Sequence, residues 1–271
     1  MKNHIGLPSP LNGGISMEKK IERENTDLII GRNAVSEALR SERAIDTLLV
    51  VRGEKHGSIG RIIAECKDKN IVVKEVDKKK LDFMCGQGNH QGVAAYVAAH
   101  EYAEVEDIFK LAEERGEDPF IIICDELEDP HNLGAIIRTA ECTGAHGVII
   151  PKRRNASLTW AVGKASAGAV EYVPVARVGN LASTIEDLKK RGVWVYCADM
   201  DGSPWCQVDF SGAVALVVGS EGSGVGRLIK EKSDFVLSLP MRGKITSLNA
   251  SVASSIMMYE VARQRLGIKA K

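Results

Sequence analysis

Apolar strand-like segments alternate with helical segments through the second half of the chain. The runs 120–124 and 214–218 are apolar throughout, which predicts strands that are buried on both faces of a sheet. The other strands are expected at 148–150, 172–178, 193–198 and 235–239, and the helices at 133–143, 158–171, 181–191, 225–232 and 249–265. This order predicts an α/β fold with a mostly parallel sheet and helices on both faces, in which ligands bind beyond the carboxyl ends of the strands.

A smaller α/β unit is expected before this sheet. Its strands are predicted at 46–51, 71–76 and 92–98, and its helices at 33–40 and 59–69. We therefore divide the chain into a disordered or extended tail at 1–26, a small α/β domain at 27–99, a helical linker at 100–118 and a larger domain at 119–271. Residues 1–16 lack the apolar core of a signal peptide, and Met17 is a candidate start of the protein.

Composition and charge exclude several classes of protein. No apolar run reaches the roughly 18 residues that a membrane-spanning helix needs. The 36 basic and 36 acidic residues cancel, which argues against indiscriminate coating of nucleic acid, although Lys78–Lys80 and Lys152–Arg154 form local basic clusters. The 6 cysteines contain no CxxC pair, so we expect neither a metal site nor a disulfide framework, and a cytoplasmic protein.

The loop at residues 129–138 is the first of three that follow predicted strands and carry polar residues. Asp129-Pro130 interrupts the apolar pattern, and Asn132 stands where the N-cap of the next helix is expected. Arg138 lies nearly two turns further along that helix and follows the apolar Ile136 and Ile137, so we expect its side chain to be held in place.

The second loop joins the buried strand 214–218 to a helix and is rich in glycine. Its polar and glycine positions are Gly219, Ser220, Glu221 and Gly222. Glycine lets a ligand approach the backbone closely, and the N–H groups of a following helix favour anions. The spacing is not GxGxxG, which makes a dinucleotide-binding loop a poor interpretation.

The third loop, residues 239–249, follows the last predicted strand and leads into the closing helix. Ser247 and Asn249 stand at the helix start, where a capping role is expected for at least one of them. Small residues fill the first turns of this helix and allow close packing of a neighbouring backbone; they are Ala250, Ser251, Ala253, Ser254 and Ser255.

Together and in this order, the three loops resemble the three motifs of the SpoU (TrmH-type) RNA 2′-O-ribose methyltransferases. The likeness covers about residues 120–265. The residues that carry it are Asn132, Arg138, Gly219, Glu221, Gly222, Leu239, Pro240, Ser247, Leu248 and Asn249. Residues 29–99, notably Gly31 to Val35, resemble the substrate-binding domain of the branch that methylates a guanosine of 23S rRNA (RlmB-like).

The resemblance implies a fold, a cofactor and residue roles that the residues alone do not establish. It implies a knotted (SPOUT-type) sheet with a trefoil knot, and a homodimer formed through the C-terminal domain. The cofactor is S-adenosyl-L-methionine, and its expected contacts are Gly219, Ser220, Gly222, Leu239, Met241 and Leu248. The expected catalytic residues are Arg138, Asn132, Glu221, Ser247 and Asn249, and the expected RNA contacts are Arg32, Lys152, Arg153 and Arg154.

The implied reaction is methyl transfer to a ribose 2′-hydroxyl, with a guanosine of 23S rRNA as the expected target. Arg138 acts either as the base that removes the hydroxyl proton or, since guanidinium is a weak base, as a clamp on the neighbouring phosphate. Three alternatives stay open at this point. They are the same chemistry on another rRNA or tRNA nucleotide, a non-catalytic RNA-binding factor for ribosome assembly, and a dinucleotide-dependent oxidoreductase.

Overall fold

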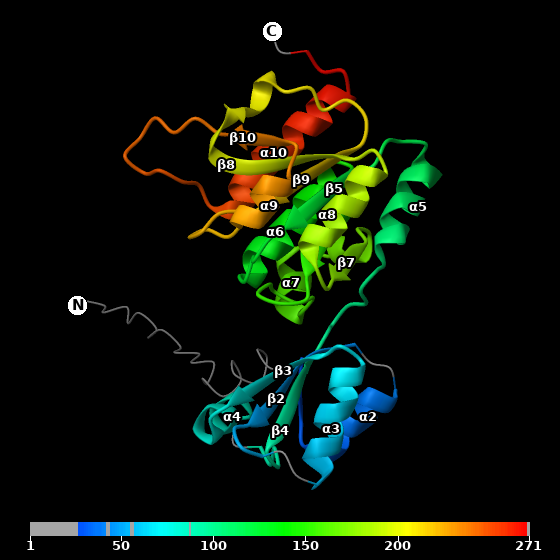
Figure 1. Ribbon diagram of the computed structural model, residues 1–271, viewed down its shortest axis with the longest axis vertical. Coiled ribbons are helices and arrows are strands. Elements are labelled where there is room, and N and C mark those ends of the chain that lie inside the picture. The colour runs from blue at the N-terminus through cyan, green and yellow to red at the C-terminus, as the bar shows by residue number, and fades with distance from the viewer. Residues whose placement is uncertain (1–26, 42–43, 55–56, 87, 270–271) are drawn as a thin grey trace, which may run out of the picture.

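The computed structural model describes residues 27–41, 44–54, 57–86 and 88–269, which form two α/β domains (Figure 1). The smaller domain comes first in the chain, and the described C-terminal residues lie at the far end of the larger domain. The expected tail at 1–26, including the candidate start Met17, lies outside the described residues.

The smaller domain is a four-stranded sheet with helices on both faces. Its strands are β1 (Leu28–Ile30), β2 (Ile45–Val51), β3 (Val72–Val76) and β4 (Val93–Val97), in the order β1-β4-β2-β3. Its helices are α2 (Arg32–Arg40), α3 (Gly57–Asp68) and α4 (Lys78–Met84). α2 and α3 pack on one face and α4 on the other. The sequence analysis predicted β2, β3, β4, α2 and α3 but not the short elements β1 and α4.

The larger domain contains a six-stranded sheet in which every neighbouring pair is parallel. Its strands are β5 (Phe120–Cys124), β6 (Gly147–Pro151), β7 (Val175–Val178), β8 (Trp194–Pro204), β9 (Val214–Val218) and β10 (Phe235–Ser238), in the order β10-β8-β9-β5-β6-β7. The predicted parallel α/β sheet is confirmed. The trefoil knot that the resemblance implies stays a prediction.

Alternate residues of the central strand β5 supply two separate cores, one on each face of this sheet. Phe120 and Ile122 face α6 (Pro130–Cys142), α7 (Trp160–Ala165) and α10 (Ala250–Arg265). Ile121 and Ile123 face α5 (Val105–Arg115), α8 (Leu181–Lys190) and α9 (Arg227–Lys232). Burial on both faces explains why the strand is apolar throughout.

Two element boundaries differ from the sequence analysis. α6 begins three residues earlier than expected, because Asp129 is its N-cap and accepts a hydrogen bond from His131 N at 2.9 Å, while Pro130 takes the first helical position. Asn132 is therefore inside the first turn and is not the cap. The helix expected at 158–171 is only α7 followed by a short 3-10 helix (Ala169–Glu171), and β7 starts after it.

The segment between the two sheets is bonded to both of them. Ala98 N donates to Ala44 O at 2.9 Å in the smaller domain, and Ala103 N donates to Val175 O at 2.9 Å in the larger one. α5 follows, with a capping box between Glu104 and Asp107, and its Ile108 belongs to the core of the larger domain that contains Ile121 and Ile123. The connection is thus a short strap, and α5 belongs to the packing of the larger domain.

A buried ion pair joins the domains beside this strap. Asp46 of β2 is paired with Arg177 of β7 and accepts a hydrogen bond from the Tyr102 hydroxyl at 2.9 Å. The Arg177 guanidinium also lies 4.3 Å from the centre of the Tyr102 ring. Burial raises the pKa of Asp46, and the positive charge of Arg177 opposes that rise.

Candidate active site

Three loops leave the carboxyl-terminal ends of strands in the larger sheet. Residues 125–129 connect β5 to α6, residues 219–226 connect β9 to α9, and residues 239–249 connect β10 to α10. β5 and β9 are adjacent and parallel, so the first two loops start side by side. The third loop extends away from the body of the domain before it returns to α10 (Figure 1). These are the three loops that the sequence analysis singled out.

Each of the three loop regions contributes one side chain to a hydrogen-bonded cluster, which we call the Asn132–Glu221–Asn249 cluster. Asn132 Nδ2 donates to Glu221 Oε1 at 3.0 Å, and Asn249 Nδ2 donates to Asn132 Oδ1 at 2.9 Å. Asn249 Nδ2 also donates to Glu221 Oε1. Because Asn132 and Asn249 stand 117 residues apart, these bonds bring distant segments to one point.

The orientation of the Asn249 amide is set by the helix that it caps. Its Oδ1 accepts hydrogen bonds from Ser251 N at 3.0 Å and from Val252 N at 3.2 Å, so Asn249 is the N-cap of α10, as expected. With the oxygen engaged by the helix, the NH2 group is directed toward Asn132 and Glu221. Capping and cluster formation therefore use opposite ends of one side chain.

Asn132 is buried in the first turn of α6 and is held there by close helix packing. The neighbouring Gly134 lies so close to α7 that a Cβ at that position would be 2.5 Å from Ala165 Cβ and 2.9 Å from Ser166 N. Only glycine permits this approach. The glycine of the first motif thus fixes the helix that carries Asn132.

The glycine-rich loop 219–226 is closed by its own backbone. Ser220 N donates to Gly224 O at 3.1 Å, and Gly224 N donates to Ser220 O at 3.0 Å. A Cβ on Gly219 would lie 2.0 Å from the carbonyl carbon of Gly224. The approach of a ligand is therefore not the reason for Gly219; the backbone of Gly224 and Val225, where the same loop turns back, excludes a side chain here.

Asp125 anchors the far end of this loop and was missed by the sequence analysis. It follows β5 directly and is buried, and its Oδ2 accepts a hydrogen bond from Gly226 N at 2.8 Å. Burial raises the pKa of its carboxyl, and the bond from Gly226 acts in the opposite direction. The available signal was an acid immediately after the apolar run 120–124, at the edge where ligands bind.

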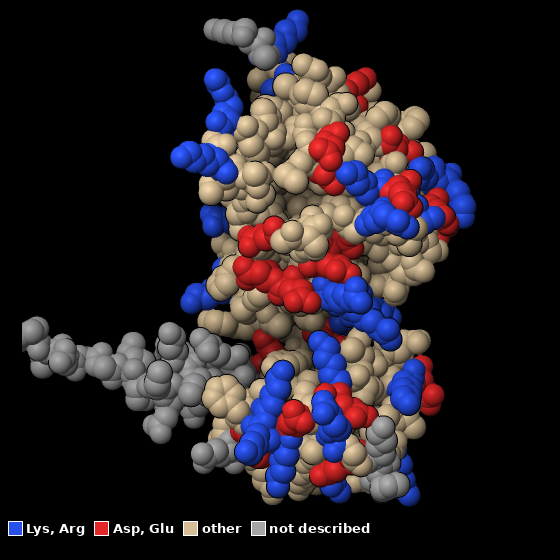
Figure 2. Space-filling view, turned by 60° about the vertical axis from the view of Figure 1, so that its left-hand side comes forward, with Lys and Arg blue, Asp and Glu red and all other residues tan. Residues whose placement is uncertain are grey.

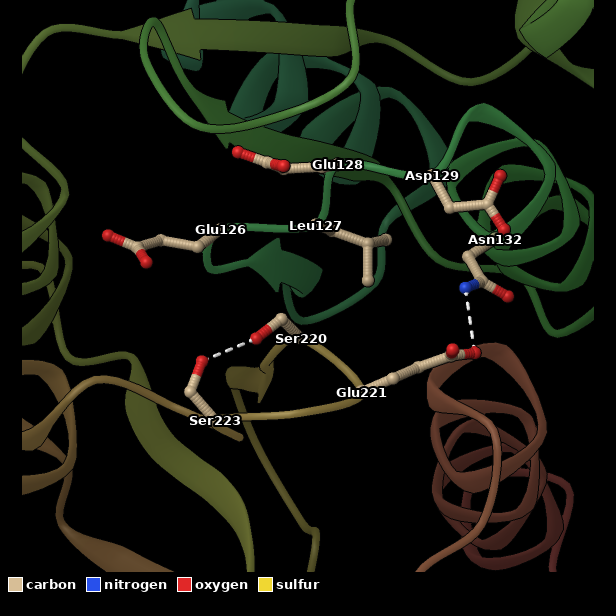
Figure 3. A pocket seen from close by; sticks show the side chains of 8 residues that line it. All are labelled: Glu126, Leu127, Glu128, Asp129, Asn132, Ser220, Glu221 and Ser223. Carbon is tan, nitrogen blue, oxygen red and sulfur yellow. Dashed lines mark hydrogen bonds between the residues drawn. The ribbon is translucent and has the colours of Figure 1, made fainter.

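The first two loops face each other across a hollow of about 330 Å³ (Figure 3). Its lining residues are Glu126, Leu127, Glu128, Asp129, Asn132, Ser220, Glu221 and Ser223. The Ser220 and Ser223 hydroxyls hydrogen-bond to each other at 2.7 Å on one side, and the Asn132–Glu221 bond closes the other side. Four carboxylates on this lining give the hollow a negative character, so it suits a positively charged ligand.

Arg138 does not belong to the cluster. It is exposed on α6, and it makes no hydrogen bond or ion pair with any residue that the structure describes. Arg138 lies six positions after Asn132, which is about 9 Å along the helix axis. The expectation that its side chain is held in place is therefore wrong, because the apolar neighbours Ile136 and Ile137 point into the core.

The remaining residues predicted to bind the cofactor lie at different depths. Gly219 is buried, Ser220 and Leu239 are half-buried, and Gly222, Met241 and Leu248 are exposed. Ser247, which is expected to be catalytic, is exposed as well. Met241 and Leu248 are exposed apolar side chains, at 37% and 38%, on the third loop. Within the described chain, Ser247 makes no hydrogen bond, so Asn249 alone of the two capping candidates has that role.

The predicted RNA-contacting residues lie in two places. Lys152, Arg153 and Arg154 follow β6 at the same edge of the sheet as the hollow, and Arg154 pairs with Glu126 at 2.8 Å. Arg32 starts α2 in the smaller domain, where its Nε donates to Gln91 O at 2.9 Å. The first group borders the hollow, while Arg32 ties two segments of its own domain together.

The comparison with family models decides the family. The model described as the SpoU rRNA Methylase family matches residues 119–259, just over half of the chain, and includes all three loops. The chain belongs to the SpoU family. A second model, described as RNA 2′-O ribose methyltransferase substrate binding, matches residues 28–103 of the smaller domain.

Curated relatives extend the likeness over most of the chain. YacO of Bacillus subtilis, a protein assigned to the TrmH family of tRNA/rRNA methyltransferases, is 53% identical over 240 residues, which are 88% of this chain and 96% of YacO. A protein of Staphylococcus aureus assigned to the same family is 47% identical over 239 residues, again 88% of this chain and 96% of the relative. The SpoU domain and the smaller domain therefore occur together in these relatives.

Solved structures of SpoU-type enzymes share the fold. An AdoMet-bound rRNA methyltransferase from Sinorhizobium meliloti has a TM-score of 0.55 and 25% identity, covering 96% of this chain and 97% of that one. The SpoU methyltransferase AviRb from Streptomyces viridochromogenes, crystallised with AdoMet, has a TM-score of 0.56 and 23% identity, covering 91% and 94%. At that identity the second likeness concerns the fold alone.

Two expected absences concern membranes and metals. No helix among the described residues is both long and apolar enough to cross a membrane. Likewise, the described part of the chain contains no group of three or more His, Cys, Asp or Glu side chains that could hold a metal ion. The six cysteines are all free.

Proposed function

We propose that this SpoU-family protein is an RNA 2′-O-ribose methyltransferase that uses S-adenosyl-L-methionine. The observation that carries the proposal is the Asn132–Glu221–Asn249 cluster, which joins the loops of all three motifs in a chain that matches the SpoU family. A non-catalytic RNA-binding factor has no need for polar side chains from three separate loops to converge on one hollow.

The residues around the hollow fit the cofactor. The carboxylates of Glu126, Glu128 and Glu221 suit its positive sulfonium and amino groups. The exposed apolar side chains of Met241 and Leu248 stand on the loop that ends at Asn249 and offer a surface for an adenine ring. When bound, S-adenosyl-L-methionine supplies a methyl group that is already strongly electrophilic.

The work that remains for the protein is to align a ribose hydroxyl and to manage its proton. The Asn132–Glu221–Asn249 cluster fixes the geometry of the loops, and Ser247 extends the polar side of the third loop. We assign Arg138 the role of a clamp on the phosphate next to the target, where its charge stabilises negative charge on the 2′-oxygen. Removal of a proton by Arg138 itself is the less favoured version, because guanidinium is a very weak base.

The target that we propose is a guanosine of 23S rRNA, with tRNA as the second candidate. The smaller domain matches a substrate-binding family of RNA 2′-O ribose methyltransferases, and the relatives carry names that include both tRNA and rRNA. Lys152, Arg153 and Arg154 border the hollow and are placed to contact phosphates, with Arg32 contributing from the smaller domain. Such a protein acts in the cytoplasm, where its RNA substrates are.

A homodimer formed through the larger domain is the assembly that we propose. α10 buries Met257, Met258 and Val261 against the sheet. Its outer side exposes Val252, Ile256 and Tyr259 at 47%, 36% and 56%, a spacing that places them on one face of the helix. An apolar stripe of this kind suits a second copy of the chain. Light scattering should then give twice the chain mass, and Ile256→Glu should give monomers.

The decisive experiment measures transfer of a labelled methyl group to RNA and then maps the methylated ribose. Unmodified 23S rRNA and tRNA transcripts are tested separately with the wild-type protein and with Arg138→Ala. We expect the variant to lose most of the transfer while its affinity for S-adenosylhomocysteine, measured by calorimetry, is unchanged. Transfer by Arg138→Ala at the wild-type rate would refute the assignment of Arg138, and label on a base would refute ribose methylation.

A further inference from the structure

The short helix α4 exposes an unusual combination of side chains. Leu81 and Cys85 are buried against the sheet of the smaller domain and hold one side of the helix in place. Phe83 lies on the opposite side. Lys79 and Lys80 precede it by four and three residues, so both are its neighbours on the helix surface. Phe83 is 83% exposed, more than any other large apolar side chain in the described chain. We call Lys79, Lys80 and Phe83 the α4 platform.

The lysines of this helix are available to an outside partner. In the described part of the chain, neither Lys79 nor Lys80 makes a hydrogen bond or an ion pair. The two acids on either side are already engaged, since Asp77 pairs with Arg52 at 3.6 Å and Asp82 pairs with His90 at 2.7 Å. Among the described residues, the platform therefore presents two lysines that have no carboxylate partner.

We propose that the α4 platform binds an unpaired nucleotide of the substrate RNA, with its base stacked on Phe83 and its flanking phosphates on Lys79 and Lys80. An exposed aromatic ring stacks on any base, and lysines beside it bind the phosphates of the backbone. The bases of a duplex are stacked on each other and do not reach such a ring, so the platform distinguishes looped RNA from helical RNA.

The position of α4 agrees with this role. The smaller domain matches a substrate-binding family, and α4 lies on the side of that domain toward which the loop 239–249 of the larger domain projects (Figure 1). On the face seen in Figure 2, basic side chains are spread over the smaller domain with acidic ones among them, whereas a cluster of acidic side chains lies on the part of the larger domain nearest to it. The acidic lining of the hollow repels phosphates except where Lys152–Arg154 lie, whereas the lysines of α4 attract them. This inference rests on the proposed function.

The test compares Phe83→Ala, Phe83→Trp and the double variant Lys79→Gln/Lys80→Gln with the wild type. The probes are a fluorescein-labelled single-stranded RNA 10-mer, a duplex of the same sequence, and unmodified 23S rRNA. We expect Phe83→Ala to weaken binding of the single strand about ten- to a hundredfold and binding of the duplex by less than about twofold. Phe83→Trp should retain affinity, and its added indole fluorescence should be quenched by the single strand. The double lysine variant should reduce the slope of log affinity against log salt by about 1.4.

Two controls separate this effect from general damage. Leu266→Ala removes another apolar side chain, 73% exposed, at the opposite end of the molecule, and Lys110→Gln removes a 72% exposed lysine of α5. Both should bind RNA as the wild type does, and all variants should keep its melting temperature. If the wild type transfers methyl groups but Phe83→Ala binds the single strand with unchanged affinity, the proposal for the α4 platform is refuted while the proposed function stands. If the wild type neither binds nor methylates RNA, both are overturned.

Discussion

Asn249→Asp separates the two roles of one side chain at the centre of the site. Aspartate caps a helix as well as asparagine does, so the bonds from Ser251 N and Val252 N to Oδ1 are retained. The NH2 group that donates to Asn132 Oδ1 at 2.9 Å is lost, and a second carboxylate then faces Glu221. The substitution therefore leaves α10 capped and breaks the cluster.

The expected net cost is about 2 kcal/mol of unfolding free energy. Two charges about 4 Å apart repel by about 1 kcal/mol in a water-like surrounding, which is appropriate because both side chains are exposed. The lost hydrogen bond to a charged group adds about 1.5 kcal/mol. The new negative charge at the start of α10 interacts favourably with the helix dipole, which offsets about 0.5 kcal/mol of this destabilisation.

Urea unfolding followed by tryptophan fluorescence measures this cost, and calorimetry with S-adenosylhomocysteine measures its effect on the site. In the double variant Glu221→Gln/Asn249→Asp the new amide can donate to the new carboxylate, so at least about 1 kcal/mol should be recovered. Asn249→Ala is the control that also loses the cap, which costs about 1 kcal/mol by itself. The reasoning is refuted if Asn249→Asp is as stable as the wild type, or if Glu221→Gln gives no recovery in its background.

Two further predictions concern packing and the domain interface. Gly134→Ala should destabilise the larger domain by about 1–3 kcal/mol, because the new methyl overlaps α7; an unchanged urea midpoint would contradict this. Arg177→Met should cost about 3 kcal/mol at pH 7, because it leaves the Asp46 carboxylate buried without its partner. Burial of Asp46 is then opposed only by its hydrogen bonds, such as the one from Tyr102, and no longer by a positive charge, so its folded-state pKa rises further above 3.8. Folding then takes up a proton, and the variant loses stability as pH rises from about 4. Between pH 4 and 7, the urea midpoint of Arg177→Met should fall further below that of the wild type as pH rises. A difference that does not change with pH would exclude ionisation of Asp46 as the cause.

The parallel sheet was predictable because its signal is local. A strand such as β5, with Phe120 to Cys124 all buried, must be apolar at every position, and few other structures require that pattern. By contrast, α4 has only 7 residues, and Leu81 is the single fully buried apolar side chain within its bounds. A helix this short does not show a repeating hydrophobic pattern in the sequence. The helix start at Asp129-Pro130 was present in the sequence, but the polar Asn132 was given the role that Asp129 takes.

The convergence of the three loops was predictable in outline, since the carboxyl ends of parallel strands share one edge of a sheet. The bonds within the site were not. The role of Asp125 depends on Gly226, which stands 101 residues away, and that of Gly219 depends on how the loop turns back on itself. Arg138 illustrates the opposite error, because apolar neighbours in a helix sequence do not say on which face the arginine lies.

The contrast between the second and third loops has a consequence for how the entropy of ligand binding is distributed. Backbone bonds between Ser220 and Gly224 hold the second loop in its final form, whereas no backbone hydrogen bond to any described residue restrains residues 240–248. Ordering a free residue costs about 1–2 kcal/mol, so fixing even two or three residues of the third loop outweighs a typical hydrogen bond. Under the proposed contact of this loop with the cofactor, substitutions that stiffen residues 240–248 should therefore raise cofactor affinity without touching any ligand atom.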